Sequence, residues 1–336
     1  MTASTVKAPA ATTAPQARGR FFTAQKLNEA GLALALVALV VVLAVTTANF
    51  ATVDNMWNIL GDAALTGIVA WAGTLVIVAG EIDISVGPAV AFWGVMLAKM
   101  AGPWGLPLPV AILLTLLGGL LVGAAAGWLR GQFGVPSFIV TLGLWSSLRG
   151  LAQFMTDALP VPIKDNSLMD RLGGKVGPVP TAAIIMFVLF AVFVFLARAT
   201  TYGRSVYAVG GNARAANLSG INVLRVRVIL FATSGLMAAL LGIVVAGRLS
   251  SGNSGAASGL EFSVIAAVVV GGTALQGGRG SMLGTLLGVL FIAVIGNGLI
   301  LLGVNSFFQD VVRGALIVAA VLINTILSGR SGRNAT

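Results

Sequence analysis

The chain has 336 residues, of which 57% are hydrophobic and only 9% are charged, and its net charge is +10. A soluble domain carries about 25% charged residues, so this composition excludes an ordinary soluble protein and indicates a polytopic α-helical membrane protein. The absence of cysteine and histidine excludes disulfides, thiol nucleophiles and histidine-based catalysis. We therefore expect no catalytic residue, no cofactor and no metal site. We also expect no nucleic-acid partner, because no soluble basic domain is present.

Residues 1–28 are rich in Ala, Thr and Pro. They predict a disordered, basic cytoplasmic tail rather than a cleavable signal peptide. A membrane domain is expected over 29–328, followed by a short cytoplasmic tail at 329–336. Ten apolar runs in this domain predict membrane spans, near 29–48, 57–79, 86–101, 109–129, 134–154, 180–197, 228–247, 263–275, 282–302 and 310–328. The eighth is short and is expected to cross only part of the bilayer.

Lys and Arg residues concentrate in alternate loops when the N-terminus is placed inside. This bias predicts that both termini are cytoplasmic, which requires an even number of spans. A faint internal similarity also links "VIVAGEIDIS" at 76–85 with "GIVVAGRLSS" at 242–251. Five spans separate the two stretches, so they predict an inverted repeat, although ten residues of Val, Ala and Gly are a weak signal.

The stretch "VAGEIDISVGP" at 78–88 places two carboxylates between apolar runs, where each costs about 2.5–3.5 kcal/mol at the centre of a spanning helix. The predicted topology moves the stretch to the inner end of the second span. Asp83 and Ser85 are then expected to cap the third span, whereas Glu81 is expected to contact a basic inner loop or to move during gating. The candidate pathway residues here are Gly80, Glu81, Asp83, Ser85 and Gly87.

The span at 134–154 carries polar side chains, among them Trp145, Ser147 and Arg149. Polar groups on a spanning segment usually face a bundle interior or a water-filled path, which makes these three residues pathway candidates. Interhelical packing by the serines is an equally good interpretation.

The longest inner loop, at 198–227, has five Arg and no acid. Its pattern predicts a turn at Gly210-Gly211, an N-cap at Asn212, a short helix over 213–218 and an end at Ser219-Gly220. An ordinary basic loop is one interpretation, and a docking helix for a cytoplasmic partner is the other. The candidates for that dock are Arg204, Gly210, Gly211, Asn212, Arg214, Leu218, Ser219 and Gly220.

The longest outer segment, at about 155–179, predicts a solvated loop or, alternatively, a docking surface for an extracytoplasmic protein. The Gly-rich turn at 277–281 does not form a nucleotide-binding loop, because the unit Gly-x-x-x-x-Gly-Lys-[Ser/Thr] occurs nowhere in the chain. We therefore do not expect ATP hydrolysis by this chain.

Three stretches together resemble the permease subunits of bacterial ATP-binding-cassette importers for monosaccharides, the ribose, xylose and galactoside branch. They are "GEIDISVGPAVA", "YGRSVYAVGGNARAANLSGINV" and "LEFSVIAAVVVGGTALQGGRGSMLGTLLG", and the similarity covers about residues 50–327. The chain departs from the family pattern at Ala213, Arg214 and Asn217 of the loop helix, and at Pro88, where Ser is common. The departures in the loop suggest a dock suited to a particular ATPase.

The resemblance implies a transporter subunit and not an enzyme, located in the bacterial inner membrane as a multi-pass protein surrounded by lipid. It implies three partners: a cytoplasmic ATPase with two cassettes, a periplasmic sugar-binding protein, and a second permease copy or paralogue. Residues 212–220 would be the coupling helix that receives the ATPase movement. The alternative is a secondary transporter, in which Glu81 and Asp83 bind the coupling ion.

Overall fold

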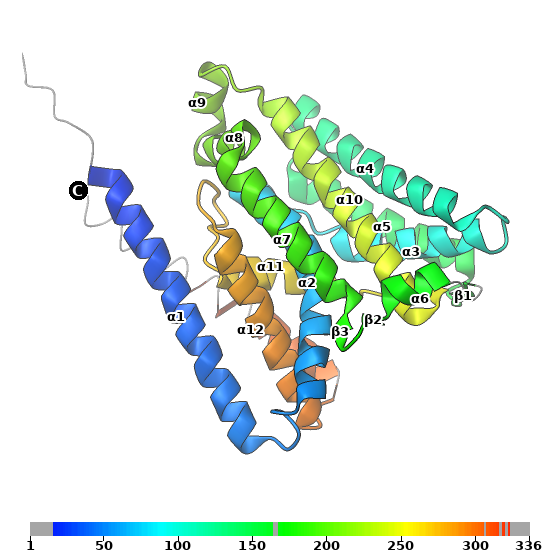
Figure 1. Cartoon of the computed structure of the whole chain (residues 1–336). Helices are drawn as coiled ribbons and strands as arrows, with labels where there is room; N and C mark the ends of the chain where they lie inside the picture. Colours follow the sequence, from blue (N-terminus) through cyan, green and yellow to red (C-terminus); the bar gives the residue numbers. More distant parts are fainter. Residues whose placement is uncertain (1–15, 164–166, 306, 316–317, 320–321, 323–336) are drawn as a thin grey trace, which may run out of the picture.

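The computed structural model describes residues 16–163, 167–305, 307–315, 318–319 and 322, and within them the chain is an assembly of helices (Figure 1). The helices are α1 (Gln16–Thr46), α2 (Val53–Val78), α3 (Val86–Ala101), α4 (Leu108–Phe133), α5 (Ser137–Thr156), α6 (Ser167–Gly173), α7 (Thr181–Ala199), α8 (Thr201–Gly211), α9 (Ala213–Leu218), α10 (Val223–Leu249), α11 (Leu260–Val270) and α12 (Met282–Leu301). The strands are β1 (Val161–Pro162), β2 (Lys175–Val176), β3 (Val179–Pro180) and β4 (Ser251–Gly252).

The prediction of an all-α polytopic membrane protein is confirmed. Six helices of the described chain, α1, α2, α4, α7, α10 and α12, are long and apolar enough to cross a membrane, and α3 and α11 are shorter apolar helices. Each of the first nine predicted spans overlaps a helix, although α11 ends at Val270, before the predicted end of the eighth span. The tenth, at 310–328, and the predicted tail at 329–336 lie largely outside the described residues. Helix α1 begins at Gln16, within the stretch predicted as the N-terminal tail.

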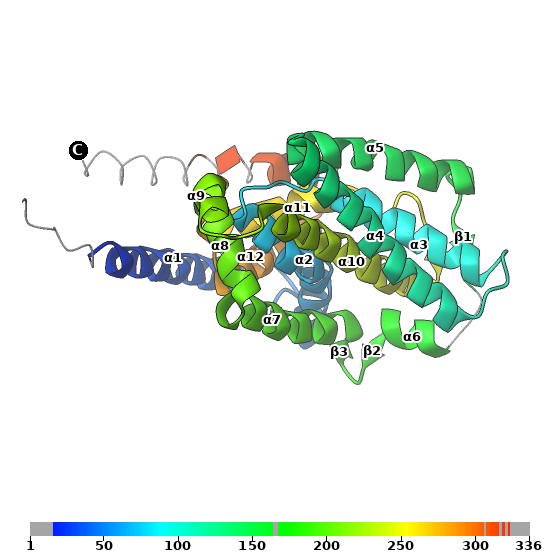
Figure 2. The same ribbon diagram turned by 90° about the horizontal axis from the view of Figure 1, so that it is seen from above.

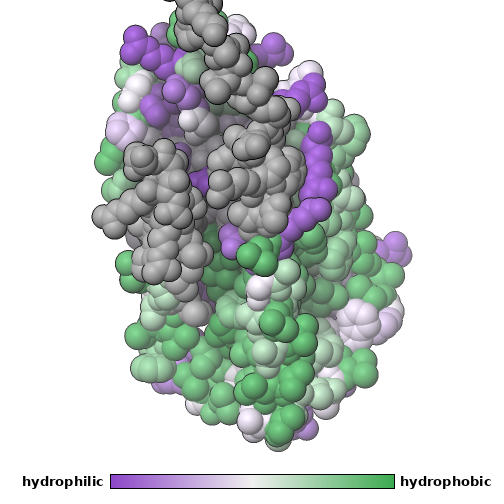
Figure 3. All heavy atoms as spheres, turned by 90° about the vertical axis from the view of Figure 1, so that its left-hand side faces the viewer, coloured by the Kyte–Doolittle hydropathy of each residue, from purple (hydrophilic) through white to green (hydrophobic). Residues whose placement is uncertain are grey.

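The outer faces of several helices are apolar, as a lipid-facing surface requires. Large hydrophobic side chains are exposed along α4 and α7, such as Leu113, Leu117 and Leu121 on α4 and Val188 and Phe195 on α7. Figure 3 shows apolar residues over much of the described surface on the side that carries α1, while hydrophilic residues gather mainly toward the end that bears α8 and α9 in Figure 1.

Helices α2 and α10 form the centre of the assembly (Figure 2). Helix α2 packs against α7, α10, α11 and α12, while α10 packs against α3, α4 and α6. Helix α1 lies at the periphery against α12. The indole of Trp71 on α2 is fully buried and donates its Nε1–H to the carbonyl oxygen of Met186 on α7 at 3.2 Å.

Helices α4 and α10 approach each other through glycines. A Cβ at Gly123 of α4 would overlap the carbonyl oxygen of Phe231, and a Cβ at Gly119 would lie 2.5 Å from the carbonyl oxygen of Gly235. Small residues at such spacing allow the backbones of spanning helices to come into contact. The sequence therefore encodes this packing in the glycines of α4.

Polar side chains connect α2 to α12 within the core. The amides of Asn55 and Asn297 form a reciprocal pair, with donor–acceptor distances of 2.9 and 2.8 Å, and both are buried. Nearer the other end of α2, the hydroxyls of Thr74 and Thr285 are 2.8 Å apart. Since every buried donor needs an acceptor in a membrane interior, these pairs fix the register of the two helices.

The segment predicted as a solvated loop at 155–179 contains short elements. Strand β1 pairs antiparallel with β4, with Val161 opposite Gly252, and β2 pairs with β3. Helix α6 buries Met169 against α10. These elements lie at the end of the molecule opposite α8 and α9 (Figure 1).

Candidate functional site

The chain breaks its helical path between α2 and α3. Helix α2 ends at Val78, Gly80 adopts a left-handed conformation with φ of +75°, and residues 81–85 have no helical structure before α3 begins at Val86. Glycine is suited to this conformation because it has no Cβ to clash with the backbone. An extended backbone beside spanning helices must find hydrogen-bond partners inside the protein.

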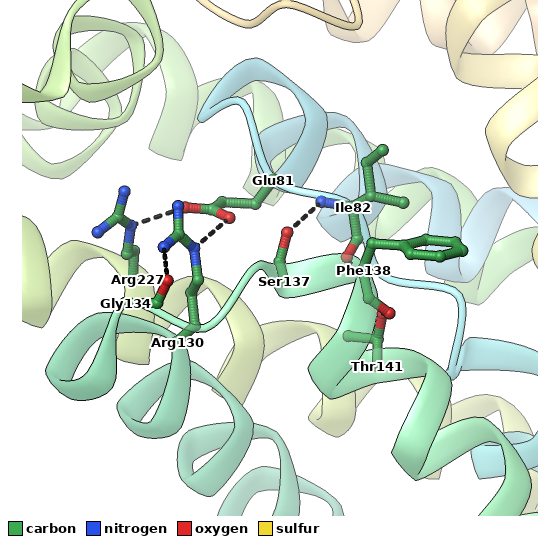
Figure 4. Close-up of polar contacts among 8 residues, drawn as sticks. All are labelled: Glu81, Ile82, Arg130, Gly134, Ser137, Phe138, Thr141 and Arg227. Carbon is green, nitrogen blue, oxygen red and sulfur yellow. Dashed lines mark hydrogen bonds and ion pairs between the residues drawn. The ribbon is translucent and has the colours of Figure 1, made fainter.

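The side chain of Glu81 occupies the first part of this break and is only 2% exposed. Its Oε2 accepts a hydrogen bond from Nε of Arg130 at 2.8 Å, and its Oε1 accepts one from Nε of Arg227 at 2.7 Å (Figure 4). Arg130 lies in the last turn of α4 and Arg227 in the first turns of α10. Two charge-assisted bonds thus compensate the buried carboxylate and tie the break to two helices.

The backbone of the break is held by side chains of α5. The N–H of Ile82 donates to Oγ of Ser137 at 3.1 Å, and the N–H of Ile84 donates to Oγ1 of Thr141 at 3.3 Å. The Thr141 hydroxyl also donates to the Ile82 carbonyl at 3.3 Å (Figure 4). The first turns of α5 therefore replace the hydrogen bonds that a continuous helix would have made.

The expectation that Ser85 caps α3 is wrong, because no side chain makes a cap hydrogen bond at the start of that helix. The Ser85 hydroxyl donates instead to Oδ1 of Asp83 at 2.6 Å, and the Ser85 N–H donates to the same oxygen at 3.0 Å. The other oxygen, Oδ2, accepts from the Ser234 hydroxyl of α10 at 2.6 Å. Asp83 therefore fastens the break to α10 rather than capping α3, since a carboxylate can satisfy several donors at once.

The first turn of α3 meets the first turn of α11 at Gly87. A Cβ at Gly87 would overlap Oε2 of Glu261, so the glycine makes room for that carboxylate. Glu261 is 2% exposed, and its Oε1 accepts from Nε1 of Trp145 on α5 at 2.9 Å. The Arg149 guanidinium lies over the Trp145 ring, 5.5 Å from the ring centroid. Of the predicted pathway residues on α5, Trp145 and Arg149 thus belong to one cluster with Gly87.

Ser147 is exposed and lies on another face of α5. It shares this face with Gly143 and Gly150, neither of which would place a Cβ within 4 Å of another atom of the described structure. This face of α5 therefore carries small residues and is not covered by another part of the described structure. It does not join the cluster that contains Trp145.

The predicted docking helix has the expected bounds. Helix α9 spans Ala213–Leu218, the Asn212 side chain caps it by accepting from the N–H of Ala215 at 2.9 Å, and Gly220 ends it with φ of +86°. Leu218 is 83% exposed and Ala216 is buried. Arg204, Arg214 and Ser219 are also exposed. An open groove of about 740 Å³ lies between parts of α9, α4 and α10, and its lining includes Arg214, Asn217 and Arg227.

The turn predicted at Gly210-Gly211 is wrong, because both residues belong to the last turn of α8. A glycine is needed at position 210 because α8 packs closely against α2, and not because the chain reverses there. A Cβ at Gly210 would overlap the carbonyl oxygen of Val78 at the end of α2, whereas Gly211 has open space around it. The N–H of Gly278 donates to the same Val78 carbonyl at 2.7 Å. The Val78 carbonyl is thus the point where the end of α2 meets α8 and the glycine-rich loop at 277–281.

Sequence reasoning did not name the partners of the break as site residues. These are Arg130, Ser137, Thr141, Arg227 and Ser234, together with Glu261 of the second cluster. A signal was present for the two arginines, because they fall in loops predicted to lie on the same side of the membrane as Glu81. Glu261 carried a signal as one of only ten acidic residues in a membrane chain. Ser137, Thr141 and Ser234 carried none.

Comparison with known proteins identifies the family. Residues 55–321 match the family model described as "Branched-chain amino acid transport system / permease component". The chain is 57% identical to the probable ABC transporter permease protein YphD of Escherichia coli strain K12, over 93% of this chain and 94% of the relative. It is 38% identical to the ribose import permease protein RbsC of the same strain, over 91% and 96%. It is 34% identical to the L-arabinose ABC transporter permease protein AraH of Azospirillum brasilense, over 95% and 94%.

No solved structure matches the chain. The match of the family model and the matches of these relatives extend over most of the chain and include both the break after α2 and the α8–α9 region. The chain belongs to this family of ABC transporter permeases, and it is a multi-pass inner-membrane subunit rather than an enzyme.

Proposed function

We propose that this chain forms the translocation path of an ATP-driven importer for a monosaccharide or a related polyol. The observation that carries the proposal is that relatives named as a ribose import permease and an L-arabinose ABC transporter permease match more than nine-tenths of the chain. Permeases of this family work with a cytoplasmic ATPase and a periplasmic binding protein. Here the ATPase supplies the energy and the binding protein delivers the solute. A path with only weak affinity suits this arrangement, because tight binding would trap the solute.

The description of the family model favours a second candidate solute, a branched-chain amino acid. The two solutes differ chemically, since an amino acid brings both charges and an apolar side chain, whereas a sugar brings only hydroxyls. Uptake with each class of solute separates the two candidates.

The proposed topology has ten spans with both termini in the cytoplasm. The pattern of helices supports an inverted repeat within it. In one half, a helix of 26 residues, α2, is followed by a break and by the 16-residue α3. In the other half, a helix of 27 residues, α10, is followed by a break and by the 11-residue α11. Broken helices at equivalent places in two repeats are typical of transport sites.

The α9 helix is the proposed coupling element, with residues 212–220 in contact with the ATPase. Exposed Leu218 offers it an apolar contact, and Arg214 offers a charge. The groove behind α9 is lined by Arg227, which also binds Glu81. Movement of α9 therefore has a short physical route to the break after α2.

The break at residues 79–85 is the proposed inner gate. Glu81 anchors it to α4 and α10 through Arg130 and Arg227. Since α8, α2 and the glycine-rich loop also meet at Val78, a shift of the α8–α9 unit would bear directly on this anchor. Release of the Glu81 ion pairs then opens the inner end of the path.

The open face of α5 is the proposed lining toward a second permease copy or paralogue. Gly143, Ser147 and Gly150 recur at helical spacing on it, and small residues on a spanning helix permit close approach of another helix. The apolar faces of α4 and α7 are assigned to lipid. The binding protein docks on the opposite side from α9, where β1, β4 and α6 lie.

The test is uptake into proteoliposomes that contain the full importer: two permease chains, the ATPase and the binding protein. ATP-dependent uptake of labelled D-ribose, D-xylose or L-arabinose supports the proposal, and uptake of leucine instead supports the amino-acid candidate. Uptake driven by a proton gradient without the ATPase would overturn both. The variants Asn212→Pro and Gly220→Leu, which disrupt α9 at its two ends, should abolish uptake while the protein still inserts in the membrane.

A further inference from the structure

The carboxylate of Glu261 is buried and only half satisfied. One of its oxygens, Oε1, accepts from Trp145, whereas Oε2 has no hydrogen-bond partner in the described structure and is closed off from solvent. A buried polar atom without a partner carries the full desolvation cost of that atom. Each such atom therefore requires an explanation, and a donor that joins during function is one.

The groups around Glu261 match the chemistry of a polyhydroxylated solute. A carboxylate oxygen accepts hydrogen bonds from hydroxyls, the half-buried Trp145 ring offers an apolar face, and the Arg149 guanidinium has donors for hydroxyl or ring oxygens. Among the residues that the structure describes, no basic group forms an ion pair with Glu261. The carboxylate is thus held in place by Trp145 without being neutralised by it.

The location of the cluster also fits a transit site. Glu261 lies in the first turn of α11, beside the first turn of α3, and both are the short helices that follow the two breaks. The start of α3 has no side-chain cap. Transporters of several folds bind solute where broken helices meet near the middle of the membrane, because the free helix ends supply polar groups there.

From these observations we propose that Glu261, Trp145 and Arg149 form a transit site for a sugar or polyol, in which Oε2 of Glu261 accepts a solute hydroxyl. This inference rests on the proposed transport function and adds a contact to it. In the present structure the site is closed, because Oε2 packs against Gly87. Separation of the first turns of α3 and α11 during alternating access exposes the oxygen to solute.

Glu261→Gln is the principal test, because the amide oxygen can still accept from Trp145 while the charge is lost. The matched control is Glu29→Gln within α1, where Glu29 accepts only a hydrogen bond from Gln25 of the same helix in the described structure. We expect Glu261→Gln to lower ATP-driven uptake of D-ribose, D-xylose or L-arabinose at least fivefold, with normal assembly, and Glu29→Gln to change it less than twofold. Where the importer accepts more than one pentose, the ratio of their rates should also change, since they differ only in the orientation of hydroxyls.

A second measurement reports occupancy of the site rather than the rate of uptake. The chain has no cysteine, so Ser146→Cys places a single thiol on α5 next to Trp145. We expect an excess of the transported pentose to slow maleimide labelling of this thiol at least twofold in the assembled importer with ATP, and to have no effect when Glu261→Gln is also present.

The outcomes separate this inference from the proposed function. An unchanged uptake rate, pentose ratio and protection from labelling in Glu261→Gln would overturn the transit site and leave the proposed importer function intact. Loss of assembly in Glu261→Gln, together with labelling of Ser146→Cys that the pentose does not slow, assigns Glu261 a structural role and also overturns the site. Absence of ATP-driven pentose uptake in the wild type overturns the proposed function, and this inference with it.

Discussion

The ion pairs of Glu81 give a prediction whose size follows from the structure. In Glu81→Gln the side chain keeps one acceptor oxygen, so one of the two bonds from the arginines is retained and the other is lost, because the amide NH2 cannot accept a hydrogen bond from a guanidinium. A bond to a charged group contributes roughly 1.5–3 kcal/mol and a neutral one roughly 0.5–1.5 kcal/mol. Loss of one bond to a charged group therefore lowers the free energy for release of the break by about 2 kcal/mol.

A change of about 2 kcal/mol corresponds to about a 30-fold change in an equilibrium constant. We expect the backbone amides of residues 81–85 to exchange with deuterium about 30-fold faster in the variant, because exchange there requires local release. Hydrogen–deuterium exchange with mass spectrometry measures this on the peptide that spans the break. Asp62→Asn is the matched control, since the Asp62–Arg248 pair is about half exposed and exposed pairs contribute about 0–1 kcal/mol.

Unchanged exchange at 81–85 in a folded Glu81→Gln variant would refute the anchoring role. Faster exchange throughout the molecule would also refute it, because that result indicates global destabilisation rather than release of one segment. A double-mutant cycle with Arg227→Gln adds a further check. Since the two residues share one bond, the effect of the double variant should fall short of the sum of the single effects.

Three more predictions each compare the same substitution at two residues of one type. Gly123→Ala should lower the melting temperature by several degrees through its overlap with Phe231 of α10, whereas Gly150→Ala should leave it unchanged or raise it, and equal effects would contradict the α4–α10 contact. Tyr207→Phe loses the bond from its hydroxyl to the Gly280 carbonyl at 3.0 Å and about 1 kcal/mol of stability, whereas Tyr202→Phe removes a buried hydroxyl without an acceptor in the described structure and should be neutral or stabilising. Burial raises the pKa of both tyrosines above 10.0, so stability should fall as the pH rises past 10, less steeply in Tyr207→Phe. Gly210→Ala should uncouple uptake from ATP hydrolysis by displacing α8 from Val78, whereas Gly211→Ala should leave the coupling normal. Normal coupling in Gly210→Ala would refute the role of that contact.

The apolar helices were predictable because long apolar runs are visible directly in the sequence. The bounds of α9 were predictable for a local reason as well, since the Asn212 cap and the Gly220 end are set by residues within one short stretch. Gly210 shows the limit of such reasoning. A glycine pair predicts a turn when only its neighbours in sequence are known, but here the glycine is required by Val78, which lies far away in the chain.

The same limit applies to the candidate site. The sequence drew attention to Glu81 and Asp83 because acids are rare in this chain, but their partners come from α4 and α10. Ser85 follows the same logic, because its hydroxyl has a choice between the helix start and a nearby carboxylate, and Asp83 is the stronger acceptor. Such competition depends on the position of the carboxylate, which local sequence does not fix.

The two acids Glu81 and Glu261 have different surroundings, and the difference bears on their roles. Glu81 is paired with two arginines and holds a segment in place, whereas Glu261 is held by one indole and retains an oxygen without a partner. A fully paired carboxylate resists movement until its partners are displaced, which suits an anchor that α8 and α9 control. A half-paired carboxylate gains a bond when a donor arrives, which suits a place that solute visits. The break after α2 thus carries a fully paired acid, which fits the proposed inner gate, and the helix after the second break carries an acid with an available oxygen, which fits the proposed transit site.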